Sequence, residues 1–499
     1  MSGSQTAVFP FNEIPQPLYV PGAYTEIRPN YSNMGAVPWP ARVLIIGQMA
    51  AAGTAVAGAI MTLYRASDAV AWFGAGSQAA GMAKRFLDNN PWTRVDIVGV
   101  ADSVGATRAG GSVAVTAAAT GNGTIALRIA GRRITVGVTS GMATTAIAAA
   151  IQAAIVAMAA SDATLPVVAT VATSTVTLTA VNGGTLGNEI SIVASPDAGD
   201  ALPAGVALTV TAMTGGATDP TADAIITAIS STWYTDLVMP AVLDDAAVTS
   251  ALETRYAAMG KLDTHLWKCV AGSYSALLTD AGTANSRFKS WLGVQNPRSP
   301  SWEIAAACAA QAIFALGNDP ARQLRGLPLV GIVPPAAADW FDEAQQNVLL
   351  PEGVSTYDVM IDGTMVLQRI VTENKTNPTT GAADQSWLDV MTPKTLSRVR
   401  YDWDTYVNLV YPRNKMALDG TIAAESDPAV VTPTRMRGTW AARSRFYETQ
   451  GWLQNTGPLA QQANFAVDAS NPNQMDMSAP VQLLGNLMVL ADIISFSLN

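Results

Sequence analysis

Histidine and cysteine are almost missing from this sequence: His265 is its one histidine, and Cys269 and Cys308 are its two cysteines. The chain therefore has too few histidines and cysteines for a metal site built from these ligands. A Ser-His-Asp triad would have to use His265. His265 falls in a stretch that we expect to be a core strand, so we interpret it as structural. Two cysteines in apolar sequence make no disulfide framework and are typical of buried free thiols, which fits synthesis in the cytoplasm.

Charged residues are also scarce, at 13% of the chain against 49% hydrophobic residues. So few charges do not cover the surface of an ordinary monomer, which favours extensive contacts between subunits, although an alanine-rich globular protein shows the same composition. The net charge is −9. A nucleic-acid-binding protein usually shows the opposite sign or a dense basic stripe, so we predict no nucleic acid as the main partner.

A targeting segment is not evident either. The first residues, MSGSQTAVFPFNEIPQPLYVPG, lack a basic region followed by an apolar run, so we expect no signal peptide. The uncharged stretch 141–161 is long enough for a membrane span but has no flanking Lys or Arg anchors. We predict a buried or half-buried helix there and no membrane insertion.

Nucleotide-binding patterns are weak. Gly74-Ala75-Gly76 matches a dinucleotide-binding motif in letters, but the residues before it look helical, whereas that motif requires a preceding strand. We interpret these glycines as the joint between two helices. Asp244 and Asp245 precede a predicted helix and suit caps better than catalysis. The sequence therefore predicts no cofactor, no metal and no catalytic residues.

Proline is plentiful in the first 40 residues, where it holds the chain extended. Large apolar residues lie between the prolines, which is unusual for a solvated linker. We therefore predict that residues 1–40 form an extended N-terminal arm that packs on something. The other end of the chain, 487–499, is an apolar tail (LMVLADIISFSL and the last Asn), which we predict to be a C-terminal arm strand.

Strands alternate with helices in 41–100 and again in 217–330, which predicts an α/β core domain. Between them, 101–216 is rich in Ala, Thr, Val and Gly, with period-two alternation, a hairpin at 124–138, a strand at 188–193 and one helix near 143–160. We predict an inserted β-rich domain there. The fold class is therefore α/β and α+β multidomain.

Residues 331–486 form the last predicted unit, a C-terminal α+β domain. Asp362-Gly363 suits a type I′ hairpin turn. Thr392-Pro393 then looks like the start of a helix whose apolar stripe runs to Pro412. Nine basic and five acidic residues fall between 391 and 445, a net charge of +4. This is either a solvated face or a basic surface that meets an acidic partner protein.

Four segments together resemble the contractile tail sheath proteins, in particular their Mu-like phage branch. They are Val20-Pro21-Gly22-Ala23-Tyr24-Thr25-Glu26-Ile27, Phe73-Gly74-Ala75-Gly76-Ser77 running to Asn89-Asn90-Pro91, Gly187-Asn188-Glu189-Ile190, and Tyr411-Pro412-Arg413-Asn414-Lys415-Met416-Ala417-Leu418-Asp419-Gly420. The resemblance runs over nearly the whole chain in a consistent order.

The resemblance implies a structural subunit of a phage tail sheath or related contractile injection system, and no enzyme. Its subunits form six-fold rings stacked helically around a tail tube protein, with baseplate and tail terminator proteins at the ends. The resemblance also implies that the C-terminal domain lies inside, against the tube, and that the inserted domain lies outside. The sheath is assembled in the bacterial host cytoplasm, becomes part of the virion tail, and contracts to drive the tube through the host envelope.

Strand exchange between subunits is expected to use both arms, with the Asp362-Gly363 hairpin as a receiving edge. The expected arm contacts are Leu18, Tyr19, Val20, Tyr24, Ile27, Leu487, Val489, Ile493, Ile494, Phe496 and Leu498. The expected tube-facing residues are Lys394, Arg398, Arg400, Arg413 and Lys415. Three alternatives stay open: another virion structural protein, a dinucleotide-dependent α/β enzyme, and a surface adhesin.

Overall fold

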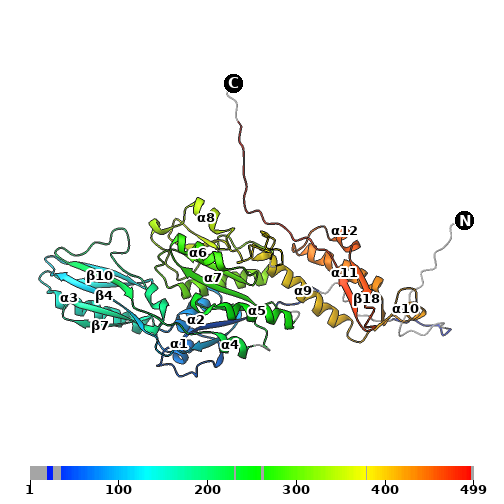
Figure 1. Cartoon of the computed structure of the whole chain (residues 1–499), viewed down its shortest axis with the longest axis horizontal. Helices are drawn as coiled ribbons and strands as arrows, with labels where there is room; N and C mark the ends of the chain where they lie inside the picture. Colours follow the sequence, from blue (N-terminus) through cyan, green and yellow to red (C-terminus); the bar gives the residue numbers. More distant parts are fainter. Residues whose placement is uncertain (1–18, 26–34, 230–231, 260–262, 378, 496–499) are drawn as a thin grey trace. The chain divides into compact units, whose positions relative to one another are not determined.

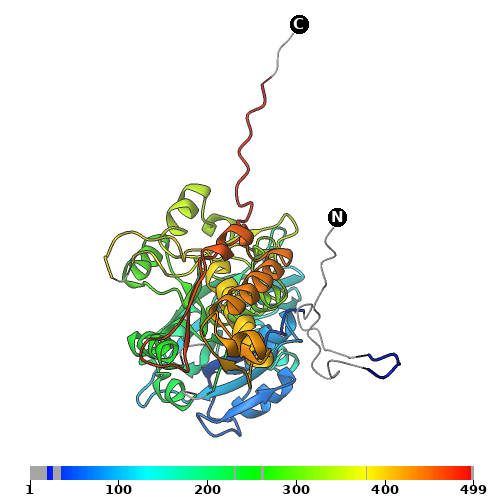
Figure 2. The same ribbon diagram turned by 90° about the vertical axis from the view of Figure 1, so that its right-hand side faces the viewer.

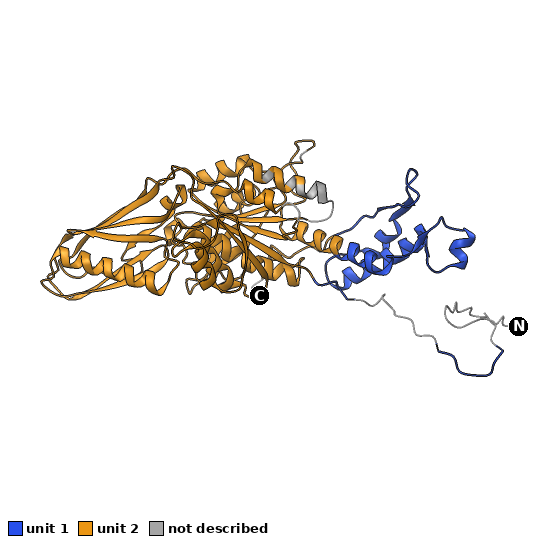
Figure 3. Ribbon diagram, turned by 90° about the horizontal axis from the view of Figure 1, so that it is seen from below, with its two compact units in different colours: residues 1–38, 402–482 blue, residues 39–401, 483–499 orange. Residues whose placement is uncertain are grey.

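The computed structural model of this chain describes residues 19–25, 35–229, 232–259, 263–377 and 379–495. These residues form a mixed α/β protein (Figure 1). They divide into two compact units, coloured separately in Figure 3. Unit 1 comprises 1–38 and 402–482, and unit 2 comprises 39–401 and 483–499.

Unit 2 is built around a six-stranded sheet in which five strands are parallel and the edge strand β2 is antiparallel. In spatial order, its strands are β13 (Lys289–Val294), β12 (His265–Ala271), β11 (Asp236–Val238), β1 (Arg42–Gln48), β3 (Arg94–Val100) and β2 (Ile60–Leu63). Successive side chains of β1 enter two different cores: Val43 and Ile45 one, Leu44 and Ile46 the other. A parallel sheet covered on both faces requires such a continuous apolar run, and the predicted alternation of strands and helices is confirmed.

Helices pack beside this sheet: α1 (Ala66–Phe73), α2 (Gln78–Asn89), α4 (Asp223–Ala228), α5 (Ala246–Met259), α6 (Tyr274–Thr283) and α7 (Ser301–Asn318). Gly74 and Gly76 adopt φ of +86° and +74° between α1 and α2, so the predicted joint between two helices is confirmed. Helix α7 begins at Ser301, with Pro300 at the N-cap position. The Ser301 hydroxyl donates a hydrogen bond to Glu189 at 2.6 Å.

Residues 101–217 interrupt this layer and build two further antiparallel sheets. One contains β10 (Ala207–Thr214), β4 (Arg108–Ala117), β8 (Thr175–Gly183) and β7 (Val167–Ala172), and the other contains β6 (Arg132–Val138), β5 (Gly123–Ile129) and β9 (Ile192–Ala194). The predicted 124–138 hairpin is confirmed by the β5–β6 pairing. The strand predicted for 188–193 is shorter, because residues Thr185–Glu189 form a 3₁₀ turn.

Helix α3 (Thr144–Ser161) packs on these strands with one face only. Its buried face consists of Ile147, Ala148, Ile151 and Ile155, at the spacing of one helical stripe. In the described part of the chain, it is the helix long and apolar enough to cross a membrane by length and composition. The prediction of a buried or half-buried helix is confirmed.

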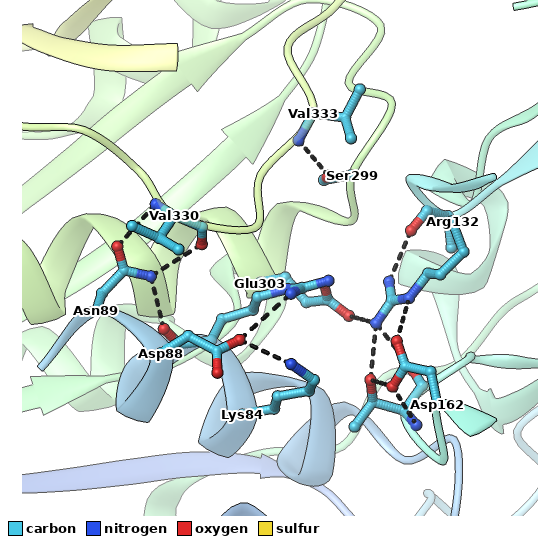
Figure 4. A network of polar contacts seen from close by, with 12 residues as sticks. Lys84, Asp88, Asn89, Arg132, Asp162, Ser299, Glu303, Val330 and Val333 are labelled. Atoms are coloured by element: carbon cyan, nitrogen blue, oxygen red, sulfur yellow. Dashed lines mark hydrogen bonds and ion pairs between the residues drawn. The ribbon is translucent and has the colours of Figure 1, made fainter. Parts of the chain in front are cut away.

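A buried ion-pair network ties this inserted segment to the central layer (Figure 4). Glu303 on α7 is fully buried and accepts hydrogen bonds from Arg85 Nε at 2.8 Å and from Arg132 Nη2 at 2.6 Å. Arg132 also pairs with Asp162 at the end of α3. Burial disfavours the charge of Arg132, but Glu303 and Asp162 overcome that effect and raise its pKa. Removing one member of such a network leaves a buried charge without compensation, which costs about 3–5 kcal/mol.

Helix α8 (Glu343–Leu349) and the hairpin of β14 (Thr356–Val359) and β15 (Met365–Arg369) complete unit 2. The predicted hairpin is confirmed, but the prediction of a type I′ turn is wrong. The strands are joined by five residues, and of Asp362 and Gly363 only Gly363 has positive φ, at +83°. Tyr357 and Leu367 belong to the same core as the central sheet. The segment 331–401 therefore packs in unit 2, whereas the sequence prediction groups it with 402–486.

Unit 1 is organised around α11 (Pro433–Thr449) and the C-terminal part of α9 (Met391–Val410). Trp403 and Trp440 contact edge to face, with ring centroids 5.0 Å apart. Its other elements are α10 (Ile422–Ser426), α12 (Thr456–Gln461), the short parallel pair β16 (Lys415–Met416) and β17 (Val430–Val431), and the antiparallel pair β18 (Asn464–Val467) and β19 (Met475–Ser478). Helix α9 begins before the predicted Thr392 cap.

Candidate functional site: the exposed chain ends and their anchors

Residues 19–25 of the N-terminal segment contain no helix or strand and present apolar side chains to solvent. Tyr19 is 87% exposed, and Val20 and Tyr24 are also exposed. The one hydrogen bond within this stretch that the structure shows runs from the Tyr24 hydroxyl to the Val20 carbonyl at 3.3 Å. Leu18 and Ile27, two further predicted contacts, lie outside the described residues. Exposed aromatic side chains on backbone outside any helix or strand are typical of a segment that another surface covers.

The root of this segment is fixed inside unit 1 by a fully buried carboxylate. Asp402 Oδ2 accepts the backbone N–H of Val37 at 2.8 Å. Asp402 Oδ1 accepts Arg443 Nε at 2.7 Å and the Tyr447 hydroxyl at 2.8 Å. Arg443 also donates to the Gly35 carbonyl at 3.1 Å. We call these residues (Asp402, Arg443 and Tyr447, holding 35–37) the arm clamp.

The side chains of the arm clamp are buried from solvent. Arg443 is buried, and its guanidinium lies over the rings of Tyr406, Phe446 and Tyr447 at 4.4–5.6 Å. Burial raises the pKa of Tyr447 strongly, and the Asp402 carboxylate adds to the shift. A charge-assisted network with little water around it holds its geometry better than an exposed pair. The N-terminal segment therefore leaves unit 1 from a rigid base.

The C-terminal tail shows the same pattern in unit 2. Residues 487–495 carry no secondary structure and run as an extended trace in Figure 2. Leu487, Val489, Ile493 and Ile494 are all exposed, the last two at 95% and 90%. Phe496 and Leu498 lie outside the described residues. The exposure of so many aliphatic side chains to water is unfavourable for an isolated chain.

The root of the tail is also anchored. The backbone N–H of Gln323 donates to Asn486 Oδ1 at 3.2 Å, and the Gln323 side chain donates to the Leu487 carbonyl at 3.1 Å. Met488 packs against the core of unit 2. Met488 is therefore the last described residue of the tail that packs on the core, and residues 489–495 are all exposed.

Two hairpins are candidates for receiving such ends. The predicted one, β14–β15, has the outer edge of β15 already occupied, since Leu327 and Leu329 exchange backbone hydrogen bonds with it. The other, β18–β19 in unit 1, is a two-stranded sheet, and no further strand pairs with it among the described residues. Phe465 on β18 is buried, while β19 is largely exposed. This hairpin offers more free backbone groups than β14–β15.

The predicted tube-facing residues are in two different situations. Lys394 donates to Asp236 at 2.5 Å, Arg398 is buried with its guanidinium over the Trp39 ring, and Arg400 pairs with Asp263 at 3.0 Å. All three therefore make contacts inside unit 2. Arg413 and Lys415 are exposed, and Lys415 forms an exposed pair with Asp427. Which partner these residues meet in an assembly stays a prediction.

The charged cluster at the end of the central sheet is internally neutralised. Asp244 forms ion pairs with both Lys268 and Lys289, and Lys268 also forms an ion pair with Glu373 at 2.8 Å. Burial opposes the charge of Lys268, but Glu373 and Asp244 overcome it and raise its pKa. Asp245 caps α5 as predicted, by accepting the backbone N–H groups of residues 247 and 248. Asp244 does not act as a cap, because the two lysines occupy it.

His265 and the two cysteines have the predicted structural environments. His265 is fully enclosed on β12 and bonds Ser290 at 3.0 Å, and burial holds its pKa well below the ordinary value. Cys269 and Cys308 are buried free thiols whose pKa values burial raises. Within the described residues, no group of three His, Cys, Asp or Glu side chains is arranged to hold a metal ion.

Sequence reasoning missed the anchoring residues. Arg443 was counted only as part of a basic surface, and Gln323, Asn486 and Met488 carried no pattern at all. One signal was available: Asp402 lies on the same side of α9 as the apolar residues Val399 and Tyr406. An acid on an apolar stripe requires a buried partner, although the sequence does not say which one.

Comparison with known proteins gives a sequence relative that matches along nearly the whole chain. The chain is 31% identical over 494 residues to the Mu-like prophage FluMu tail sheath protein of Haemophilus influenzae, covering 98% of this chain and 99% of that protein. No protein-family model matches the sequence.

Two solved structures are similar at lower identity. The sheath tail protein of Desulfitobacterium hafniense is 11% identical with a TM-score of 0.46, over 93% of this chain and 100% of that one. The sheath tail protein Lin1278 of Listeria innocua is 10% identical with a TM-score of 0.47, over 91% and 94%. TM-scores below 0.5 mark a loose correspondence of folds, so the family assignment rests on the sequence relative alone.

Proposed function

Because the chain belongs to the Mu-like phage tail sheath protein family, we propose that it polymerises as helically stacked six-fold rings around a tail tube and contracts to drive the tube through the host envelope. Its role is structural and not enzymatic. The observation that carries the proposal is the pair of exposed apolar ends, each leaving the fold from an anchored root. The proposed partners are further copies of the chain, the tail tube, and baseplate and terminator proteins.

The linkage between copies is strand addition. A strand in globular proteins usually spans about three to ten residues, and the segments 19–25 and 487–495 are long enough to form one on a neighbouring copy. The β18–β19 hairpin is the proposed acceptor, because a two-stranded sheet is only marginally stable in water and gains from each added strand. An exposed strand edge on a monomer tends to pair with other chains and causes aggregation. Pairing of this edge with a strand from another copy of the chain removes that hazard.

The arm clamp and the tail anchor make this linkage mechanical. A strand added to a neighbour transmits force only if its other end is fixed. Asp402 and Arg443 fix the N-terminal segment in unit 1, and Gln323 with Met488 fixes the tail in unit 2. Subunits joined in this way stay linked while they rotate during contraction. The extended sheath is then a kinetically trapped state that needs no nucleotide.

The tube-facing surface is proposed for the 391–445 region, with Arg413 and Lys415 as its exposed charges. Lys394, Arg398 and Arg400 support this region indirectly, through the internal contacts of α9. Reversal of these three charges would therefore disturb the fold together with any interface. Arg413 and Lys415 are the cleaner test of a tube contact.

Negative-stain electron microscopy of the purified protein tests this function. Striated hollow tubes, or stacked rings after concentration, are the expected result. Smooth tubes, icosahedral shells or a stable monomer at every concentration would contradict it, and the first two would favour another virion structural protein.

A further inference from the structure

One edge of the central sheet carries an exposed aromatic and basic patch. Trp92 is 80% exposed and Tyr64 is 79% exposed, although large aromatic side chains normally lie inside a fold. The β2–β3 register pairs Leu63 with Val95, so residues 64 and 92–94 lie at the same end of this edge. The guanidinium groups of Arg65 and Arg94 are also exposed there, beside Asp68 and the buried Asp96. We call Tyr64, Arg65, Trp92 and Arg94 the aromatic edge.

The backbone of the aromatic edge is fixed to the core at Trp92. The fully buried Asn90 side chain accepts the backbone N–H of Trp92 at 3.2 Å and donates to the Ala310 carbonyl on α7 at 3.2 Å. Trp92 is therefore held outward by the core. Beside it, β2 is a terminal strand of the sheet, and no other strand pairs with its outer edge among the described residues. Trp, Tyr and Arg on a preorganised base are the residue types that dominate protein interfaces.

The opposite edge of the same layer has the complementary character. Residues 326–368 contain six acidic and no basic residues. The acids are Asp339, Asp342, Glu343, Glu352, Asp358 and Asp362. Among them lie exposed apolar side chains, notably Met360 and the fully exposed Ile361 at the tip of the β14–β15 hairpin. We call the surface formed by 339–362 the acidic hairpin surface.

The two surfaces lie far apart within one copy. The aromatic edge is at β2, and the hairpin continues the layer beyond β13, where Gly293 donates to the Ser355 carbonyl and Ser355 donates to the Trp291 carbonyl. Figure 1 accordingly shows α1, which follows β2, and α8, which precedes β14, on opposite sides of this layer. A surface that is complementary to a different surface of the same molecule makes a head-to-tail contact, which closes into rings or continues as a helix.

We propose that the aromatic edge of one copy docks on the acidic hairpin surface of the next copy, as a second interface besides the exchange of chain ends. Trp92 and Tyr64 then cover Met360 and Ile361, while Arg65 and Arg94 face Asp358 and Asp362. Copies that each carry a net charge of −9 repel one another in general, so a local meeting of opposite charges fixes which faces come together. This inference rests on the proposed function, because it requires a homopolymer.

Charge exchange in the full-length chain tests the contact. Arg65→Glu and Asp358→Arg are made separately and together, and polymer is measured by sedimentation across protein concentrations and by negative stain. Each single reversal is expected to raise the critical concentration for polymerisation about tenfold or more, equivalent to ~1.4 kcal/mol. The combined variant is expected to recover most of this loss, since the two charges again have opposite signs. Arg108→Glu, an exposed charge reversal on β4, is the matched control and is expected to behave as wild type.

A second variant separates the contact from charge effects. Trp92→Ala is expected to raise the critical concentration with little change in its salt dependence, while its melting temperature stays near that of wild type because the side chain is mostly in solvent. Unchanged polymerisation of Arg65→Glu, Asp358→Arg and Trp92→Ala, with wild-type tubes present, would overturn the edge contact and leave the sheath function standing. A combined variant no better than the single reversals would also overturn it. Wild-type protein that never polymerises would remove both proposals.

Discussion

Replacement of Arg443 by methionine is the most informative single perturbation of the arm clamp. Arg443 contacts the Asp402 carboxylate twice, through a hydrogen bond from Nε at 2.7 Å and an ion pair from Nη2 at 2.6 Å. The Val37 N–H and the Tyr447 hydroxyl donate two further hydrogen bonds to Asp402. Methionine fills much of the space under the aromatic rings but removes the positive charge. Asp402 then stays fully buried without its cation.

The expected cost follows from that geometry. Removing one partner of a buried pair costs about 3–5 kcal/mol, a large part of the stability of a small unit. With ordinary urea dependence, the unfolding midpoint of unit 1 falls by about 1–5 M. Tyr447→Phe removes a single hydrogen bond to the same carboxylate and is expected to cost less, about 1.5–3 kcal/mol. Lys415→Met, which breaks an exposed pair with Asp427, is the control and is expected to leave the midpoint unchanged.

Urea titration followed by tryptophan fluorescence and circular dichroism measures these midpoints. The double variant Asp402→Asn, Arg443→Met decides the mechanism, because it removes both charges and is expected to be more stable than Arg443→Met alone. If Arg443→Met unfolds with the wild-type midpoint, or if the double variant is the less stable of the two, the reasoning about the clamp is refuted. Loosened residues 35–37 should also make the N-terminal segment a faster proteolysis site in Arg443→Met.

Three further predictions concern the ends, the surface and a buried acid. Deletion of 1–30 is expected to leave a folded, soluble monomer that forms no stable sheath, since the clamp at 35–37 remains; normal tubes in negative stain would show that the segment is dispensable. Reversal of Arg413 and Lys415 to Glu is expected to weaken co-assembly with tail tube protein in a salt-dependent way, and wild-type co-sedimentation at low salt would leave these charges as a solvated face. Burial raises the pKa of Glu189 from 4.5 to about 7, with the Ser301 hydroxyl opposing and Asp219 adding. A raised acid pKa means that the folded state binds more protons, so stability should fall as pH rises from about 4.5 to about 7. Glu189→Gln should flatten that slope in thermal melts, and an unchanged slope would assign it to other groups.

Much of the secondary structure follows from local sequence. The RVLIIG run predicts a buried strand because few other elements hide so many consecutive apolar residues, and it becomes β1 at the centre of the sheet. The glycines at 74 and 76 mark a joint because their left-handed backbone excludes a continuous helix. The sequence of 124–138 predicts a hairpin, and the structure pairs β5 with β6 there. In each case, the signal and the structure lie within the same few residues.

The arm clamp and the anchor of the tail could not be predicted from local sequence, because the residues that form them are distant from one another in the chain. Asp402 and Arg443 lie on two helices, and Val37 joins them from the other end of the chain. Charge counting placed Arg398 and Arg443 on a surface, since buried guanidinium groups are rare and composition does not distinguish paired from solvated ones. The domain boundary at 330/331 was drawn where the sequence pattern changes, whereas the packing of Tyr357 and Leu367 keeps this segment with the central sheet.

The central claim is that both chain ends are completed by sister copies. A cryo-EM reconstruction of polymers grown from the purified full-length protein tests it most directly. The account predicts that residues 19–25 and 487–495 form backbone hydrogen bonds with strands of neighbouring copies, with the Asp402–Arg443 contact intact at the root of the N-terminal segment. A polymer in which both segments fold back onto their own subunit, with no pairing between copies, would contradict it.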